Sequence, residues 1–200
     1  MVQPVPTAQP GQPVMPASEV LTFTEALSLE SQPWIWAIRG PVFSAKSTIA
    51  LSIKGRKFVF DLEQGVKRAA WRYPHDYIET WHCPPNVDLL TYGKGDRILG
   101  QRERWEMLTH KYIEVLGRKD IDVIIFDTSK EVWTIAHQCH LQEKQETQLA
   151  KEMADKHLTA EIAAAGIGWR QSLQSIEYAI PNQRMSNFIK LSREYGKSLV

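Results

Sequence analysis

The sequence has little cysteine and no long apolar run, and each absence excludes a class of protein. Its 200 residues include two cysteines, Cys83 and Cys139, which stand far apart and belong to no Cys-x-x-Cys pair. A disulfide framework and a cysteine-based zinc site are therefore not expected, and a reducing compartment such as the cytoplasm fits best. No apolar stretch approaches the ~20 residues that span a bilayer, and the N-terminus does not resemble a signal peptide. We expect neither a membrane partner nor secretion.

The chain also lacks a net charge of either sign. Its 24 Lys and Arg residues are balanced by 23 Asp and Glu residues, which gives a formal charge of +1. Any contact with nucleic acid would therefore need a local basic patch. Residues 1–18 carry no charged side chain and are rich in Pro and Gln, a composition that predicts a disordered tail. Residues 19–200 are long enough for one sizeable core, and we expect one domain there.

Apolar runs alternate with helical periodicities along the rest of the chain. Strands are expected at residues 34–39, 57–62 and 121–126, with weaker signals at 77–81 and 198–200. Helices are expected at residues 46–53, 101–116, 130–164 and 182–195. A further helical stretch is expected after Gly65, and it runs through Trp71. The run IDVIIF at 121–126 is nearly all aliphatic, as a strand covered on both faces must be. This alternation predicts an α/β fold with a mainly parallel sheet sandwiched by helices.

A phosphate-binding motif follows the first expected strand. Residues 40–47 are Gly-Pro-Val-Phe-Ser-Ala-Lys-Ser, the spacing of a P-loop in which Ala45 replaces the second glycine. Backbone N–H groups of such a loop, and the N-terminus of the helix after it, bind phosphate. We expect Lys46 to reach the β- and γ-phosphates of ATP, and the Ser47 hydroxyl to complete the shell of a Mg²⁺ ion. The predicted nucleotide-binding residues are Gly40, Pro41, Val42, Phe43, Ser44, Ala45, Lys46, Ser47 and Thr48.

Two considerations affect the prediction of a phosphate site from this motif: how often the pattern occurs by chance, and the backbone strain at Ala45. A chain of this length contains the relaxed pattern by chance roughly once in a hundred cases, but its placement between an apolar run and a helix is the context that a P-loop requires. If the position of Ala45 requires a positive φ, a side chain there costs about 1–2 kcal/mol. The sequence therefore predicts a nucleotide site with a weakened loop.

Two carboxylates at expected strand ends complete the candidate site. Asp127 follows the most aliphatic strand and is the predicted Mg²⁺ ligand; the alternative is a helix N-cap formed by residues 127–129. Glu63 follows the strand after the P-loop and is the predicted group that polarises water, with Asp61 two residues earlier on the same face. The alternative for Glu63 is an ordinary surface turn. Lys46 and Glu63 are the predicted catalytic residues.

Taken together, residues 40–48, 58–65 (FVFDLEQG) and 122–129 (DVIIFDTS) resemble the ATPase core of RecA-like proteins, particularly the phage-type AAA family that includes single-strand annealing ATPases. The resemblance covers most of residues 34–200. It implies a RecA-like P-loop NTPase core, with Glu63 in the place of the water-activating glutamate and Asp127 in that of the Walker B aspartate. It also implies a homo-oligomer, and the host cytoplasm for a phage protein. The strand that would sense the γ-phosphate lies at or beyond Val200, which indicates either a very short last strand or a truncated chain.

Three functions are compatible with this motif. The first is a Mg²⁺-dependent ATPase of DNA recombination, annealing or replication that binds single-stranded DNA. A basic and aromatic cluster is available for that contact, although such a cluster is more often an amphipathic helix with its side-chain stems packed: Lys67, Arg68, Trp71, Arg72 and Tyr73. The second is a small-molecule kinase, for which Arg102, Arg104 and Arg184 are the available arginines. The third is a non-hydrolysing nucleotide-binding or packaging subunit. The histidines and cysteines at 82–83 and 137–140 lack ligand spacing, and a structural role is expected for them.

Overall fold

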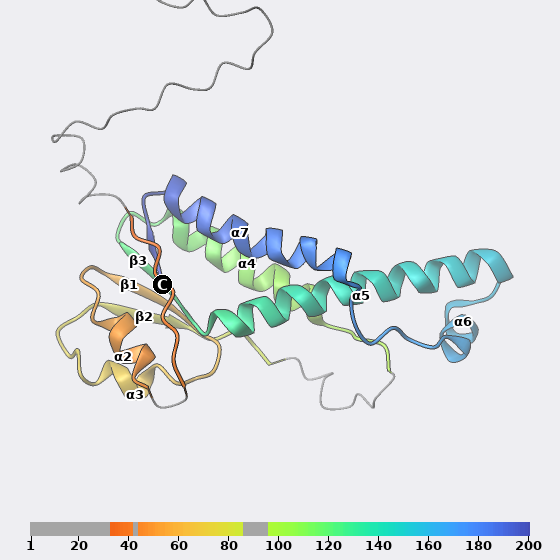
Figure 1. Cartoon of the computed structure of the whole chain (residues 1–200), viewed down its shortest axis with the longest axis horizontal. Coiled ribbons are helices and arrows are strands. Elements are labelled where there is room, and N and C mark those ends of the chain that lie inside the picture. The colour runs from red at the N-terminus through yellow and green to blue at the C-terminus, as the bar shows by residue number, and fades with distance from the viewer. Residues whose placement is uncertain (1–32, 42–43, 86–95) are drawn as a thin grey trace, which may run out of the picture. The chain divides into compact units, whose positions relative to one another are not determined.

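The chain folds around a sheet of four parallel strands (Figure 1). The computed structural model describes residues 33–41, 44–85 and 96–200, so the predicted tail and the loop residues Val42 and Phe43 lie outside the described part. The strands are β1 Lys57–Asp61, β2 Ile78–Trp81, β3 Val123–Asp127 and β4 Ser198–Leu199. Their spatial order is β2-β1-β3-β4. The predicted α/β class with a parallel sheet is confirmed.

The two central strands are buried on both faces. In β1, Phe58 and Phe60 point to one side of the sheet and Val59 points to the other, as the period of two requires. Strand β3 follows the same alternation, because it pairs Phe58 with Ile124 and Phe60 with Phe126. All five residues of β1 are buried. The continuous apolar runs in the sequence therefore correspond to strands that carry helices on both sides.

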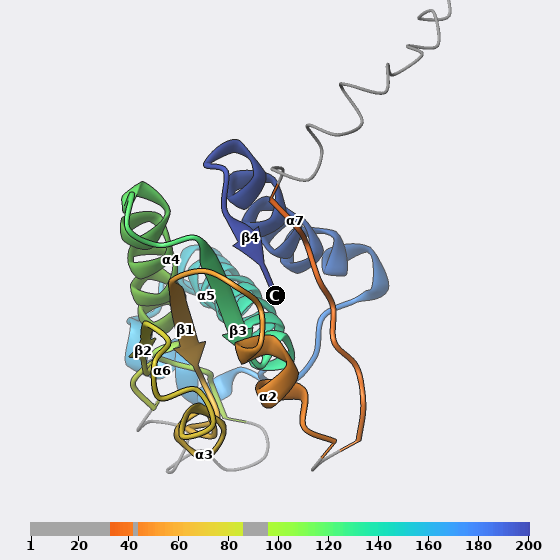
Figure 2. The same ribbon diagram turned by 90° about the vertical axis from the view of Figure 1, so that its left-hand side faces the viewer.

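Two short helices cover one face of the sheet. They are α2 Lys46–Leu51 and α3 Lys67–Ala70 (Figure 2). Their apolar side chains and those of the central strands form one core cluster, whose buried members are Ala50, Leu51, Val59, Val66, Ala69, Val123 and Ile125. This cluster holds the helix that follows the predicted phosphate loop against the sheet.

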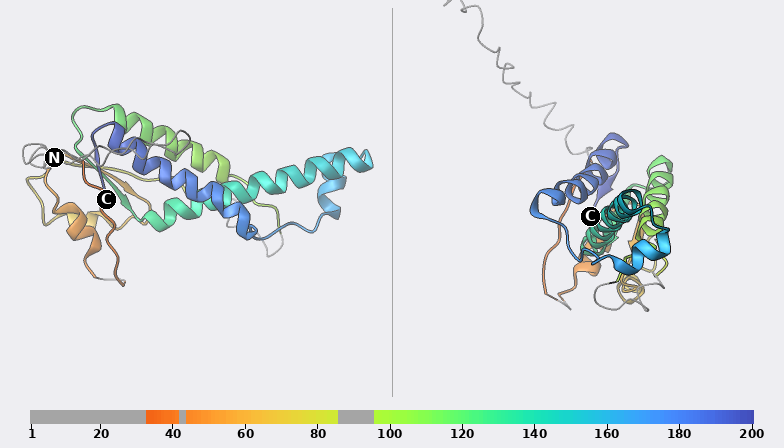
Figure 3. Two further views of the ribbon diagram at one scale, coloured as in Figure 1. Left: turned by 45° about the horizontal axis from the view of Figure 1, so that its top comes forward. Right: turned by 90° about the vertical axis from the view of Figure 1, so that its right-hand side faces the viewer.

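Three longer helices cover the opposite face and lie side by side (Figure 3). They are α4 Gln101–Gly117, α5 Ser129–Lys156 and α7 Ala179–Glu194. Aromatic rings fill this core: Tyr112 stacks on Phe126 with ring centroids 5.7 Å apart and meets the edge of Phe188 at 4.5 Å. The Tyr112 hydroxyl donates to the carbonyl of Phe188 at 2.6 Å. The prediction of a sheet with helices on both faces is confirmed.

The expectation of a buried strand at residues 34–39 is wrong. Only Ile35 forms a bridge there, pairing in parallel with Leu199 of β4. Trp34 and Trp36 are 59% and 47% exposed. The reason is position: among the described residues this segment is outermost beyond β4, so it has a neighbour on one side and little cover. Its place still brings the start of the predicted loop to the sheet.

The remaining helices differ from expectation at their ends. The predicted helix over 130–164 is interrupted at His157, whose φ of 50° ends α5, and the chain resumes in α6 Ala160–Gly166. Helix α7 begins at residue 179, three residues earlier than predicted, and follows a 3₁₀ turn over Ser175–Tyr178. Within the described residues, no helix combines the length and apolar character needed to cross a bilayer.

Candidate nucleotide site

The candidate site lies between β1 and β3, where the order in which the chain adds strands to the sheet changes from one side to the other. After β1 the chain continues to β2 on one side, and after β3 it continues to β4 on the other. In parallel α/β sheets, ligands bind beyond the carboxyl ends of the strands at such a switch point. Asp61 and Asp127 are register partners at the ends of β1 and β3. A ligand is therefore expected beyond these two strand ends, and this expected position is called the crevice below.

Helix α2 brings the end of the predicted loop to this crevice. The Ser47 hydroxyl donates a hydrogen bond of 2.7 Å to Oδ2 of Asp127, which is 80 residues away in sequence. Burial raises the pKa of Asp127, and the negative charges of Asp61 and Glu63 raise it further, while the bond from Ser47 and the charge of Lys46 lower it. Two predicted Mg²⁺ ligands and the predicted phosphate-binding lysine thus lie together.

Described residues of the segment before α2 contact the lysine. Lys46 Nζ donates to the carbonyl oxygens of Gly40 at 3.0 Å and Pro41 at 2.7 Å. The loop is tight at Gly40, where a Cβ atom would lie 2.4 Å from Oγ of Ser44. A side chain at Gly40 would therefore require the Ser44 hydroxyl to move, and its Cβ atom would still lie 3.2 Å from Cβ of Ser44.

Ala45, the residue directly before α2, adopts the left-handed backbone conformation, with φ 58° and ψ 24°. The positive φ considered from the sequence is confirmed. A non-glycine residue there costs about 1–2 kcal/mol. The loop therefore contains local strain at the position where the P-loop pattern has glycine.

Glu63 reaches the same crevice from the turn after β1. It is exposed and accepts a hydrogen bond of 3.0 Å from the Thr128 hydroxyl to Oε1. Asp61 has a different role: it is fully buried and accepts bonds from the backbone N–H groups of Gly65 and Val66 at 2.9 and 3.3 Å. Asp61 therefore holds the turn that carries Glu63, and its buried carboxylate lies close enough to Asp127 to raise the pKa of that residue.

Asp127 does not cap α5, which was the alternative role expected for it. Thr128 occupies the N-cap position of α5, and no side chain caps that helix. Asp127 instead bonds to Ser47. The peptide bond between Asp127 and Thr128 is cis.

Helix α2 is also tied to the turn beyond α3. The Tyr73 hydroxyl donates to the carbonyl oxygen of Thr48 at 2.7 Å. This contact was not predictable, because the sequence indicated Tyr73 only as a member of a basic and aromatic cluster. In that cluster Trp71 is 70% exposed, and the guanidinium of Arg72 lies 5.5 Å from its ring centroid.

The three candidate arginines are bonded elsewhere. Arg102 pairs with Glu146, and Arg104 donates to the carbonyl of Pro84 at 3.1 Å. Arg184 pairs with Glu143 at 2.6 Å on the α5–α7 side of the sheet. Among the described residues, none of the three arginines is hydrogen-bonded to the predicted phosphate loop or to the ends of β1 and β3.

The histidines and cysteines of α5 have partners within the fold. His140 Nδ1 lies 2.7 Å from Glu143, which also bonds to Cys139. His137 packs against the rings of Trp133 and Tyr178, at centroid distances of 5.0 and 5.3 Å, and these two rings are themselves 6.1 Å apart. Across residues 33–41, 44–85 and 96–200, no group of three or more His, Cys, Asp or Glu side chains is arranged to hold a metal.

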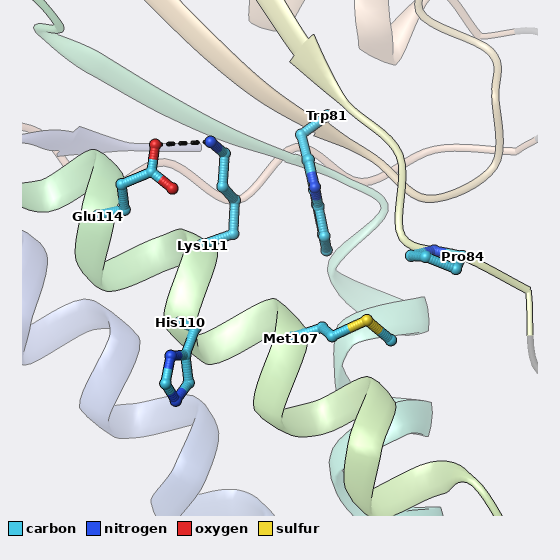
Figure 4. Close-up of a pocket in the computed structure, with 6 residues that line it drawn as sticks. All are labelled: Trp81, Pro84, Met107, His110, Lys111 and Glu114. Atoms are coloured by element: carbon cyan, nitrogen blue, oxygen red, sulfur yellow. Dashed lines mark hydrogen bonds and ion pairs between the residues drawn. The ribbon is translucent and has the colours of Figure 1, made fainter.

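Two grooves lie away from the crevice. One, of 480 Å³, lies between the end of β2 and α4 (Figure 4) and is lined by Trp81, Pro84, Met107, His110, Lys111 and Glu114. The other, of 260 Å³, lies between α4 and α7. Neither groove is lined by a described residue of the predicted phosphate loop, so the case for a nucleotide site depends on the contacts at the strand ends.

Comparison of the chain with protein-family models, with characterised proteins and with solved structures gave no match in any of the three. The functional argument therefore depends on the chain's own residues and their arrangement.

Proposed function

We propose that this protein binds ATP and Mg²⁺ at the crevice between β1 and β3, as a P-loop NTPase of the RecA-like type, and hydrolyses the nucleotide. The observation that carries the proposal is the bond between Ser47 and Asp127. It joins the hydroxyl that ends the P-loop motif to the carboxylate at the end of the most aliphatic strand. The motif and the acidic strand end are recognisable separately, and their contact is the relationship that a nucleotide site requires.

The phosphates would bind to the loop and to Lys46. In the structure the Lys46 ammonium is held by the carbonyl oxygens of Gly40 and Pro41 at the mouth of the loop. Phosphate oxygens are stronger partners for an ammonium than neutral carbonyls, because both groups are charged. We therefore infer that Lys46 exchanges these carbonyls for the β- and γ-phosphates when ATP binds.

The residues present fit a Mg²⁺ ion. Hydroxyl and carboxylate oxygens are the ligands that Mg²⁺ prefers. The Ser47 hydroxyl and the Asp127 carboxylate already lie within hydrogen-bond distance of each other. Burial, and then the negative charges of Asp61 and Glu63, raise the pKa of Asp127, and a bound cation would stabilise its ionised form. When bound, the ion would neutralise charge on the β- and γ-phosphates.

Glu63 would orient the attacking water. Its carboxylate lies beside Asp127 closely enough for the two charges to interact. The water oxygen attacks the γ-phosphorus, its proton passes to the Glu63 carboxylate, and the bond to ADP breaks. This assignment gives Glu63 and Asp127 separate roles on neighbouring strands.

Single-stranded DNA is the proposed partner in recombination, annealing or replication. The exposed Trp71 and the cations of Lys67, Arg68 and Arg72 support it, since aromatic stacking together with positive charge suits single strands. Because the candidate arginines have partners elsewhere in the described part, we propose that a second copy of the chain supplies a cation to the site.

The test is ATP hydrolysis with Mg²⁺, in the presence and absence of single-stranded DNA. Wild type is compared with Lys46→Ala and Glu63→Gln, and with Lys54→Ala as an exposed lysine control. Turnover that DNA stimulates, and that only the first two variants lose, supports the recombination-type ATPase. Binding without turnover under every condition would favour the non-hydrolysing subunit, a reading to which the strained Ala45 lends some support. Transfer of phosphate to a small acceptor would favour the kinase.

A further inference from the structure

Thr128 has an unusual role for a residue at the start of a helix. It occupies the N-cap position of α5, a helix of 28 residues, yet its side chain makes no capping bond. Threonine at this position ordinarily accepts a bond from a backbone N–H in the first turn. Here the hydroxyl donates instead to Oε1 of Glu63, at 3.0 Å. The Thr128 hydroxyl thus contacts the proposed water-orienting carboxylate and does not cap the helix.

Glu63 depends on this contact for its position. It lies on an exposed turn, next to Gln64 with a φ of 56°, and it forms no ion pair within the described part of the chain. An exposed carboxylate on a turn would otherwise sample several rotamers in water. The N-terminus of α5 adds a partial positive charge on the side from which Thr128 approaches. Both effects favour one orientation of the carboxylate.

The same two segments are also joined through the backbone. The N–H of Leu62 donates to the carbonyl oxygen of Asp127 at 2.8 Å. Residues 62–63 therefore lie alongside residues 127–128, with a backbone bond at one step and a side-chain bond at the next. The position of Glu63 is thereby set relative to Asp127, the proposed Mg²⁺ ligand.

We propose that Thr128 is a positioning residue, whose hydroxyl orients the Glu63 carboxylate toward the attacking water. This inference rests on the proposed ATPase function and goes beyond it, since that proposal gives Thr128 no role in turnover. Thr128 touches no phosphate in this account. It acts through Glu63, so its loss slows turnover and leaves nucleotide binding unchanged.

The experiment compares Thr128→Val, Thr128→Ser and Thr134→Val on the full-length chain. Valine keeps the shape of threonine without the hydroxyl, and serine restores the hydroxyl. Thr134 is the matched control: it lies on the same helix, is also half-buried, and bonds only to the backbone carbonyl of Lys130. The measurements are kcat for ATP with Mg²⁺ and single-stranded DNA, and Kd for a fluorescent ATP analogue.

We expect Thr128→Val to lower kcat about 10-fold, because a donor to a charged group is lost. Its Kd should stay within about 2-fold of wild type, and Thr128→Ser should recover most of the rate. In a Glu63→Gln background, Thr128→Val should lower the residual single-turnover rate little further, because the two residues act as a unit.

Three results would overturn the inference, and they can be told apart. If wild type hydrolyses ATP and Thr128→Val matches Thr134→Val in kcat, the positioning role is wrong while the ATPase proposal stands. If wild type neither binds nor hydrolyses ATP, the proposed function fails and the positioning role with it. A loss of rate that Thr128→Ser does not recover, or that comes with weaker binding, would assign Thr128 a structural role instead.

Discussion

The Ser47 hydroxyl and the Asp127 carboxylate lie 2.7 Å apart although 80 residues separate them in the chain. One belongs to the first turn of α2, and the other ends β3. Since these elements come from distant parts of the sequence, their contact is a property of the sheet order and of the register between β1 and β3. It also places a half-buried carboxylate where a cation would be stabilised.

Replacing Ala45 by glycine should stabilise the protein. The left-handed φ of 58° costs alanine about 1–2 kcal/mol, while glycine adds roughly 0.5–1 kcal/mol of unfolded-state entropy. The expected net gain is about 0.5–1 kcal/mol in the free energy of unfolding, measured by urea denaturation. Ala70→Gly in α3 is the control and should destabilise. Equal losses in both variants would contradict the strain assigned to Ala45.

Asp127→Asn should raise stability at neutral pH while it removes Mg²⁺-dependent nucleotide binding. The folded-state pKa of Asp127 is raised above 3.8, chiefly by burial, so ionisation of this group opposes folding at pH 7. The destabilisation develops as the pH rises from about 3.8 through the folded-state pKa. Asparagine keeps an oxygen for Ser47 without the charge.

The corresponding measurement is thermal unfolding of both proteins from pH 3 to pH 8. The advantage of Asp127→Asn should vanish below about pH 3.8, where aspartate is protonated in both states. A variant that is less stable than wild type at pH 7 would show that the ionised carboxylate helps hold the fold together, contrary to this account.

Tyr73→Phe should loosen the attachment of α2. The variant loses the hydroxyl that donates to the carbonyl of Thr48 at 2.7 Å. We expect a loss of about 0.5–1.5 kcal/mol in the free energy of unfolding and weaker ATP binding, since α2 carries Lys46 and Ser47. Tyr195→Phe is the control, because Tyr195 is 53% exposed. Identical curves for the two variants would remove Tyr73 from the account of the site.

The sequence was most informative where burial is two-sided. Continuous apolar runs at 57–62 and 121–126 predicted β1 and β3, because only strands covered on both faces need such runs. The run at 34–39 has the same character but lies at an edge, and local pattern does not distinguish the two cases. The break at His157 was also missed, since neither glycine nor proline marks it.

The candidate site was predictable in its parts and not in its contacts. Residue types and spacing indicated Lys46, Ser47 and Asp127 individually. Thr128 bonds to Glu63, which is 65 positions away in the chain, and Tyr73 bonds to Thr48, which is 25 positions away. No periodicity in the sequence encodes such pairs. The bonds of Asp61 to the backbone of Gly65 and Val66 were not predictable for the same reason, because they do not follow from the alternation of strand residues.

The most direct test of the central claim is nucleotide binding itself. The Kd of a fluorescent ATP analogue is measured by titration with and without Mg²⁺ for wild type, Lys46→Ala and Lys54→Ala. The account predicts Mg²⁺-dependent binding that Lys54→Ala retains and that Lys46→Ala weakens roughly 100-fold, about 2.7 kcal/mol. Wild-type binding that Lys46→Ala leaves intact, or no binding at millimolar nucleotide, would contradict the site at Lys46 and Asp127.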